Sequence, residues 1–294
     1  MAKKAKESSG DILESLENKY GVGRVSRQEL TIVSTGSIQL NRAMRIGGTP
    51  LGKIIELMGM ESAGKSTITL HQIAEYQKAF PERRVALIDF EYSFDPDYAE
   101  AIGIDVDNLL IYQPDCLEIG FNLIIDLVSK DIVSAVVIDS QTAAAPKAII
   151  DGEMGDSTMG LQARLNSKFC LKIKGLLSIH RCTLFVISQM RQNIGAMMAD
   201  SNIATGGNAW KFYSDVRWKI WKTNDKDNEL NKTTIDIIKS KVGKPFGKAV
   251  VSIIWGVGFD KIGEIINYAT EFGFIKRGGA GWLTLGEYKA QGNE

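Results

Sequence analysis

Histidine and cysteine are scarce in this chain, which has two histidines and three cysteines among its 294 residues. The cysteines, Cys116, Cys170 and Cys182, have no spacing typical of metal ligands. The sequence therefore argues against a zinc site or a disulfide framework. It favours buried free thiols in a reducing compartment.

Long apolar runs and an excess of one charge are also absent. No apolar run reaches the length of a membrane span, and no signal-peptide pattern opens the chain, so we expect a cytoplasmic protein without a membrane partner. Lys plus Arg and Asp plus Glu both number 35, which gives a net charge of zero. This balance argues against a surface coated in basic residues. It does not exclude a local DNA-binding stripe, because charges of opposite sign can be segregated.

Residues 59–67 contain the phosphate-loop pattern G-x-x-x-x-G-K-[ST], which ends at Ser66 and is typical of nucleotide-binding proteins. The preceding apolar run predicts a buried strand, and the following residues predict a helix whose N-terminus faces the phosphates. Lys65 is expected to reach the β- and γ-phosphates, and the Ser66 hydroxyl is expected to join a Mg²⁺ shell. The predicted nucleotide-binding residues are Gly59, Met60, Glu61, Ser62, Ala63, Gly64, Lys65, Ser66 and Thr67.

From residue 46 onward, strand and helix patterns alternate, which predicts an α/β fold with a mostly parallel sheet. The predicted central strands are 54–58, 85–90, 135–139 and 183–188. The predicted helices lie near 66–79, 95–102, 117–130 and 160–180. Later strands at 216–222, 233–241 and 249–255 are expected to extend the sheet antiparallel. The tail from residue 261 predicts a helix near 262–273 and little else.

A short amphipathic helix is predicted ahead of the main domain. Ile12, Leu16 and Tyr20 fall on one face of it, and Gly21 ends the pattern. The apolar stripe needs a surface to cover it, either on the same domain or on a neighbouring subunit. The residues alone favour neither.

Polar side chains end three of the predicted strands, at the edge where α/β proteins bind ligands. Asp139 is expected to hold Mg²⁺, directly or through water. Glu91 is the candidate for orienting and deprotonating an attacking water, and Asp89 either tunes Glu91 or bonds a loop. The alternative is a pair of solvated carboxylates. The amide of Gln189 is suited to sensing a γ-phosphate without adding charge.

Two long stretches with little periodicity, 150–160 and 190–207, leave strands that touch the predicted nucleotide site. Loops of this length inside a compact domain usually have a function or are disordered. We expect them to convey the state of the nucleotide to a second ligand.

Several ordered motifs resemble those of the bacterial RecA recombinase family, from about residue 12 to about residue 291. The most extended are IDFEYSFDP at 88–96, GEMGDSTMGLQAR at 152–164 and TGGNAWKFY at 205–213. The resemblance implies a RecA-like P-loop ATPase core preceded by a helix and strand. It also implies an ATP-dependent helical filament on single-stranded DNA that pairs this DNA with a homologous duplex and exchanges strands.

The resemblance assigns roles around the nucleotide. Glu91 matches the catalytic glutamate and Gln189 the γ-phosphate sensor, so we expect both to act in catalysis with Lys65. ATP and Mg²⁺ are the implied cofactors, with Ser66 and Asp139 at the metal. The remaining matched residues are Asp95 and Tyr98 at the adenine, and Lys239 and Lys241, which reach the ATP of the adjacent subunit.

The resemblance also implies a DNA site formed by the loops around 152–160 and 190–206. Met159 and Ile194 match side chains that wedge between bases, which costs a few kcal/mol per opened step. The residues matched to DNA-backbone contacts are Arg164, Arg191, Gly206 and Gly207. Such contacts tolerate any base sequence, as recombination requires.

Three domains are expected from the resemblance. They are an oligomerisation segment at 1–35, an ATPase core at 36–260, and a remnant of a C-terminal domain at 261–294. The match of the first segment to one that docks on a neighbour favours a subunit contact for the N-terminal helix.

The chain departs from the family pattern in three places. Ser188 stands where Asn is common, and Asn193 replaces a basic residue. Most of the C-terminal domain is missing, which predicts either a reduced, phage-encoded member or a truncated form of a longer protein. Loss of that domain puts duplex capture in doubt.

Two other functions fit the same core. One is an ATP-gated scaffold on single-stranded DNA without efficient strand exchange, and the other is a helicase-like ring motor. The N-terminal helix and the paired lysines favour a filament over a ring, through the resemblance alone.

Overall fold

The computed structural model describes residues 9–20, 30–153, 160–192, 202–204, 207–223 and 230–291. It divides into two compact units, Met1–Thr31 and Ile32–Glu294. The first unit contains helix α1 (Ser9–Tyr20), in which no described residue is buried. Ile12, Leu16 and Tyr20 on this helix are all exposed, and the predicted helix is confirmed.

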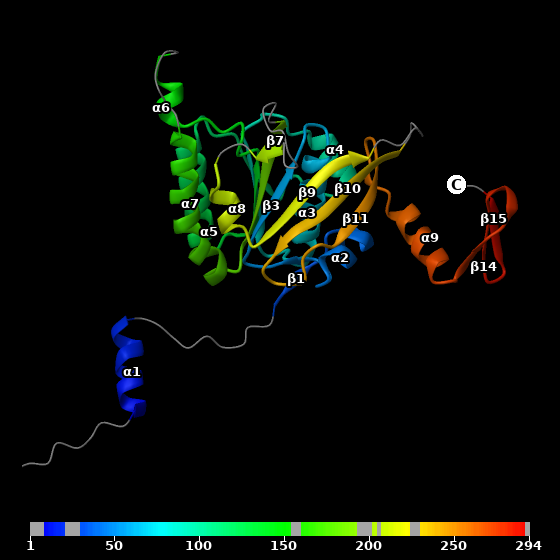
Figure 1. The fold of residues 1–294 in the computed structure, drawn as a ribbon, viewed down its shortest axis with the longest axis horizontal. Helices are drawn as coiled ribbons and strands as arrows, with labels where there is room; N and C mark the ends of the chain where they lie inside the picture. The colour runs from blue at the N-terminus through cyan, green and yellow to red at the C-terminus, as the bar shows by residue number, and fades with distance from the viewer. Residues whose placement is uncertain are drawn as a thin grey trace, which may run out of the picture. The chain divides into compact units, whose positions relative to one another are not determined.

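The second unit is built on one large sheet. Its strands are β3 (Ile54–Gly59), β4 (Arg84–Asp89), β5 (Leu109–Tyr112), β6 (Val133–Asp139), β7 (Thr183–Gln192), β8 (Asn202–Ala204), β9 (Val216–Thr223), β10 (Leu230–Ser240), β11 (Lys248–Ile254) and β12 (Gly258–Phe259). Over the described residues the order is β12-β11-β10-β9-β3-β7-β6-β4-β5, and β8 pairs with β7. Figure 1 labels the middle of this order, from β7 through β3, β9 and β10 to β11. The stretch from β9 to β5 is parallel, and β10 to β12 are antiparallel. The predicted mostly parallel sheet is confirmed.

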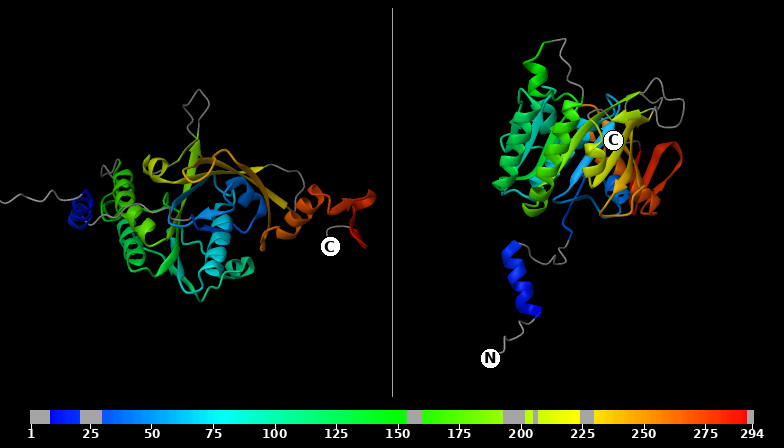
Figure 2. Two further views of the ribbon diagram at one scale, coloured as in Figure 1. Left: turned by 90° about the horizontal axis from the view of Figure 1, so that it is seen from below. Right: turned by 60° about the vertical axis from the view of Figure 1, so that its left-hand side comes forward.

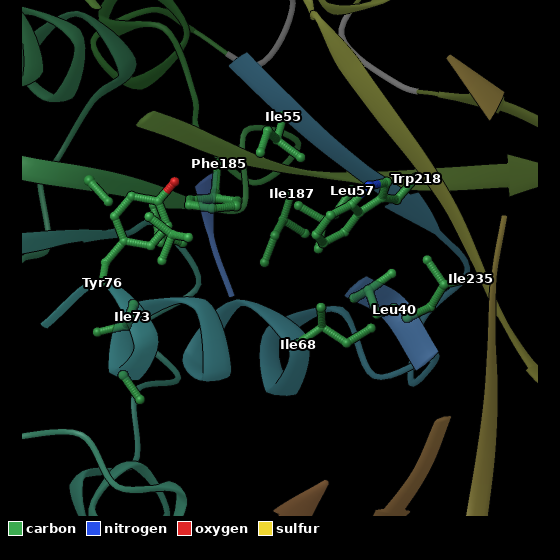
Figure 3. Close-up of a cluster of buried hydrophobic side chains, with 14 of the residues drawn as sticks. Leu40, Ile55, Leu57, Ile68, Ile73, Tyr76, Phe185, Ile187, Trp218 and Ile235 are labelled. Carbon is green, nitrogen blue, oxygen red and sulfur yellow. The ribbon is translucent and has the colours of Figure 1, made fainter. Parts of the chain in front are cut away.

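Helices cover both faces of this sheet (Figure 2). They are α2 (Ile38–Met44), α3 (Lys65–Ala79), α4 (Pro96–Ile102), α5 (Leu117–Ser129), α7 (Leu161–Ile179) and α8 (Ala209–Tyr213). The four-residue helix α6 (Lys147–Ile150) buries no residue. Side chains of α2, α3 and α4 pack in one apolar core, and side chains of α5, α7 and α8 pack in the other. In the first core, Ile68 of α3 faces Leu57 and Trp218 of the sheet (Figure 3). Burial of both faces explains why the central strands are continuous apolar runs in the sequence.

Three strand predictions need correction. β9 pairs with β3 in parallel rather than antiparallel, because α8 first carries the chain back so that the Asp215 amide can donate to the Ile54 carbonyl oxygen at 2.8 Å. β5 was missed, since its four residues at the sheet edge are too short to show a pattern. β7 continues to Gln192 and pairs with β8, so part of the expected loop at 190–207 is strand.

The tail holds more structure than expected. Helix α9 (Lys261–Glu271) is followed by an antiparallel sheet of β13 (Ile275–Arg277), β14 (Trp282–Leu285) and β15 (Tyr288–Gln291). These strands have three or four residues each and are largely exposed, so they have no buried alternation that would have marked them in the sequence. A short antiparallel pair of β1 (Ile32–Val33) and β2 (Thr49–Pro50) opens the unit.

Glu264 anchors α9 to the core. Its buried carboxylate accepts hydrogen bonds from the Ser37 hydroxyl at 2.7 Å, the Ile38 amide at 2.8 Å and the Gln39 amide at 3.0 Å. These groups surround the N-terminus of α2, where the free amides favour a negative charge. One side chain therefore satisfies three donors 225 to 227 residues away in the sequence.

We expect Glu264→Ala to lower the free energy of unfolding by about 1–3 kcal/mol, because it leaves these three donors without an acceptor. Urea unfolding followed by circular dichroism measures the change. Glu271→Ala is the matched control, because its ion pair with Arg42 is exposed and solvent screening should leave it a much smaller contribution. Equal losses in the two variants would contradict the anchoring role.

Candidate nucleotide site

The phosphate loop connects β3 to α3 and is shaped by two glycines. Gly64 has a φ of 89° and stands at the N-cap of α3, a left-handed conformation in which a side chain is strained. A Cβ at Gly59 would overlap the carbonyl oxygen of Ile220 on β9. The loop can therefore approach β9 closely, and it leads directly into the N-terminus of a 15-residue helix that favours bound phosphate.

Lys65 lies inside this loop and is nearly buried, at 7% exposure. Its Nζ donates to the Met60 carbonyl oxygen at 2.6 Å. Burial lowers the pKa of the ammonium, and the charges of Asp139, Glu91 and Glu61 partly oppose that shift. The cation is thus held among carboxylates in a poorly solvated place, where it would interact strongly with an added anion.

Asp139 ends β6 beside the loop. Burial raises the pKa of its carboxyl to about 7, although a hydrogen bond from Ser66 and the charge of Lys65 both act in the other direction. Its Oδ1 is buried and has no hydrogen-bond partner among the described residues. A buried oxygen without a donor beside a hydroxyl is a set that a hard divalent cation can complete, so the two residues predicted at a metal fit Mg²⁺.

Glu91 and Gln189 meet at the site, although Glu91 follows β4 and Gln189 lies within β7. Gln189 Nε2 donates to Glu91 Oε1 at 2.8 Å, and the Ser140 hydroxyl donates to the same oxygen. The sequence predicted roles for Glu91 and Gln189 but gave no sign of their contact or of Ser140. The pairing places the expected base and the expected γ-phosphate sensor in one hydrogen-bonded group.

Asp89 is not placed to act as the base together with Glu91. It is 1% exposed, and its carboxylate accepts hydrogen bonds from the Glu91 amide at 3.0 Å, the Ser93 amide at 2.9 Å and the Gln113 side chain at 3.1 Å. The interpretation in which Asp89 bonds a loop therefore holds. Its contribution is to fix the turn that presents Glu91.

A cavity of about 480 Å³ runs from the phosphate loop past Glu91, Asp139 and Gln189 to Asp95 and Tyr98. Asp95 caps α4 by accepting from the Tyr98 amide at 3.1 Å, and the Tyr98 hydroxyl lies 3.1 Å from that of Thr67. All the predicted catalytic residues and the predicted adenine contacts thus line one cavity.

The cavity has a second wall that the sequence did not predict. It comes from β9, β10, β11 and the turn after β11, and its residues are Lys222, Asn231, Thr233, Ile253, Trp255 and Gly256. Trp255 is 78% exposed. In the sequence, a tryptophan at the end of a predicted strand, followed by glycine, was the signal that could have indicated this wall.

Lys239 and Lys241 lie away from this cavity. Lys239 is six residues beyond Thr233 on β10, which corresponds to roughly 20 Å along a strand. Its Nζ donates to the carbonyl oxygens of Lys211 at 2.7 Å and Phe212 at 3.1 Å, and burial lowers its pKa. Lys241 lies 3.7 Å from a carboxylate oxygen of Asp215. Neither lysine lines the chain's own cavity.

Only part of the predicted DNA site is described. Arg164 is exposed in the first turn of α7, and a Cβ on Gly207 would lie 2.6 Å from that of Ala163, so these two predicted residues lie close together. The backbone of Arg191 pairs with Ile203. The Arg191 side chain and the other predicted residues, Met159, Ile194 and Gly206, lie outside what the structure describes.

No helix in the described ranges has both the length and the apolar character that crossing a membrane requires.

Comparison with known sequences agrees with the geometry. Residues 10–260 match the family model described as RecA N-terminal domain. The chain is 42% identical over 292 residues to Protein RecA of Chloroherpeton thalassium, which covers 96% of this chain and 81% of that protein. It is 41% identical over 294 residues to that of Chlorobaculum tepidum, with 96% and 84% covered. For Staphylococcus carnosus the identity is 39% over 293 residues, with 96% and 82% covered.

Proposed function

Because this chain belongs to the RecA family, we propose that it is a DNA-dependent ATPase that forms a helical filament on single-stranded DNA, pairs it with a homologous duplex and exchanges strands. The observation that carries the proposal is the contact of Gln189 with Glu91 at the mouth of a cavity that also holds the phosphate loop. A γ-phosphate in the cavity would lie beside both a base and an amide that leads into the expected DNA-binding region.

Different residues of the chain bind the phosphates, the metal ion and the base of ATP. The loop amides and Lys65 hold the β- and γ-phosphates, and Ser66 with Asp139 holds Mg²⁺. When bound, this ion offsets phosphate charge in the transition state. Asp95, Tyr98 and the second wall with Trp255 enclose the base. The buried Oδ1 of Asp139 supports the metal assignment.

Glu91 then orients the attacking water and accepts its proton at the carboxylate. Two donors, Gln189 and Ser140, fix the position of Oε1, which leaves Oε2 to face the water. Fixing a base in this way contributes through orientation as well as basicity.

The subunit contacts follow from two features of the single chain. Lys239 and Lys241 are about a strand length from their own cavity, which suits cations that complete the cavity of an adjacent subunit. The apolar side chains of Ile12, Leu16 and Tyr20 on α1 suit docking on a neighbour. We assign residues 1–35 to this contact, 36–260 to the ATPase core with its two DNA-binding loops, and 261–294 to a remnant of a C-terminal domain.

The DNA site would combine backbone contacts from Arg164, Arg191, Gly206 and Gly207 with wedges from Met159 and Ile194. The closeness of Gly207 to the first turn of α7 supports this grouping. Single- and double-stranded DNA are the proposed partners.

The test is ATPase activity with and without single-stranded DNA, followed by a strand-pairing assay with a homologous duplex. Stimulation together with pairing is expected. Stimulation without pairing would indicate the scaffold, and translocation by a closed ring would indicate the helicase-like motor.

Trp255 offers a check on the second wall of the cavity. We expect Trp255→Ala to weaken ATP binding by about tenfold, because stacking of a base on an aromatic ring contributes about 1–3 kcal/mol. Trp255→Phe should retain most of the affinity. Titration with a fluorescent ATP analogue measures both. If the Ala variant binds as tightly as the parent chain, the base does not reach this wall.

A further inference from the structure

Gln141 uses its backbone and its side chain to join α7 to β7. Its amide donates to the Ile187 carbonyl oxygen at 3.1 Å, and its carbonyl oxygen accepts from Gln162 Nε2 at 2.8 Å. Its Oε1 accepts from Asn166 Nδ2 at 3.2 Å, and its Nε2 donates to the Ser188 hydroxyl at 3.4 Å. This one residue therefore makes two hydrogen bonds to the helix and two to the strand.

The hydrogen bonds continue across the sheet in buried surroundings. The Ser188 hydroxyl donates to Glu56 Oε1 at 3.0 Å, and Arg217 Nε donates to Glu56 Oε2. Gln141, Ser188, Glu56 and Arg217 are each at most 8% exposed. Buried polar groups are costly unless paired, so a network of this kind fixes the relative positions of the elements that carry it.

The elements joined by this network lead in sequence to the two stretches that are proposed to bind DNA. Helix α7 begins two residues after the stretch 154–159, and β7 leads into the stretch 193–201. Gln189 stands between Ser188 and the end of β7. Its amide donates to Thr142 Oγ1 at 3.0 Å, and Gln141 Nε2 donates to the same oxygen at 3.3 Å. Gln141 thus contacts the strand directly before Gln189 and, through Thr142, supports the amide of Gln189 itself.

From this arrangement we infer that Gln141 is a positioning residue that acts through Gln189. It holds the first turns of α7 and the end of β7 in one register, so that a shift in either element moves the amide that contacts Glu91. This inference rests on the proposed function, because it needs DNA at the loop bases and a γ-phosphate at Gln189. It adds a route between them that does not pass through the nucleotide cavity, which Gln141 does not line.

Coupling of this kind is a free-energy difference between two states of the chain, and it acts equally in both directions. ATP should tighten DNA binding by the same factor by which DNA tightens ATP binding. That factor is typically between about 5 and 150. Without Gln141, the two elements are free to move separately, and the factor should fall.

The experiment uses Gln141→Met, which keeps the side-chain length and removes the side-chain hydrogen bonds with Asn166, Ser188 and Thr142. Affinity for a single-stranded oligonucleotide is measured with a non-hydrolysable ATP analogue and with ADP. We expect the ratio of the two affinities to fall at least about threefold, while affinity for the ATP analogue without DNA stays within about threefold of the parent chain.

Two further variants separate coupling from a loss of folding. Gln141→Met combined with Asn166→Leu removes a donor and its acceptor together, a change that buried sites tolerate better than loss of one partner. Tyr76→Phe removes buried hydrogen bonds to Thr183 at 2.9 Å and Thr49 at 3.3 Å, and none of these three residues lines the cavity. The double variant should show the reduced ratio, and Tyr76→Phe should not.

A parent chain with full coupling and a Gln141→Met variant that keeps the same ratio would overturn the inference. An equal loss of the ratio in Tyr76→Phe would also overturn it, because the effect would then be general softening. A parent chain that shows neither a nucleotide-dependent ratio nor DNA-stimulated ATPase activity would instead refute the proposed function, and the inference with it.

Discussion

Replacement of Lys65 by Ala is expected to nearly abolish ATP binding or turnover. The ammonium lies within the phosphate loop, where it donates to the Met60 carbonyl oxygen, and it is held in a poorly solvated place beside Asp139, Glu91 and Glu61. Its removal leaves these carboxylates without the charge that offsets them, just where the β- and γ-phosphates would add more negative charge. Both the loss of attraction and the gain of repulsion oppose binding.

The measurement is ATP affinity by calorimetry and turnover by phosphate release, at a Mg²⁺ concentration held constant. Lys78→Ala is the matched control, since that lysine lies on the same helix but is 56% exposed and paired with Glu75. It should leave both quantities unchanged. Normal affinity and normal turnover in Lys65→Ala would show that the nucleotide does not occupy this loop.

The Glu91→Gln variant should keep ATP and DNA binding but hydrolyse ATP more slowly by about a hundredfold or more, as for loss of a general base. The structure indicates that this substitution can keep the hydrogen bonds of the Glu91 side chain while removing its basicity. Glu91 Oε1 accepts from Gln189 and Ser140, and a glutamine oxygen can accept both bonds as well. The change therefore falls on the other carboxylate oxygen, which becomes an amide nitrogen without basicity.

Single-turnover hydrolysis with and without single-stranded DNA measures this effect, with DNA affinity as the control for folding. Hydrolysis at the parent rate would exclude Glu91 as the base. Asp89 would be a poor replacement, because its carboxylate already accepts hydrogen bonds from Glu91, Ser93, Phe94 and Gln113.

Sequence patterns predicted what is local along the chain. The phosphate loop, its flanking strand and helix, and the polar ends of three strands all follow from short stretches with strong physical constraints. The positions of α3, α5 and α7 were predicted to within about two residues for the same reason. Each buries an apolar face over several turns, which leaves a periodic trace in the sequence.

The parts that were missed depend on contacts between distant residues. The contact of Gln189 with Glu91 requires the order of β7, β6 and β4 in the sheet, and no local pattern encodes that order. The wall containing Trp255 depends on where β11 ends relative to the phosphate loop. The strands of the tail were missed because little of their surface is buried, so burial did not shape their sequence.

Because Lys239 and Lys241 lie away from their own cavity, the number of complete nucleotide sites in a filament differs from the number of chains. In the proposed filament each chain donates its lysines to one neighbour and receives lysines from the other, an arrangement that never closes on itself. A polymer of any length then has one end whose catalytic centre lacks these cations. Hydrolysis per chain should therefore rise with polymer length and level off, and the two ends should differ in how readily they lose subunits.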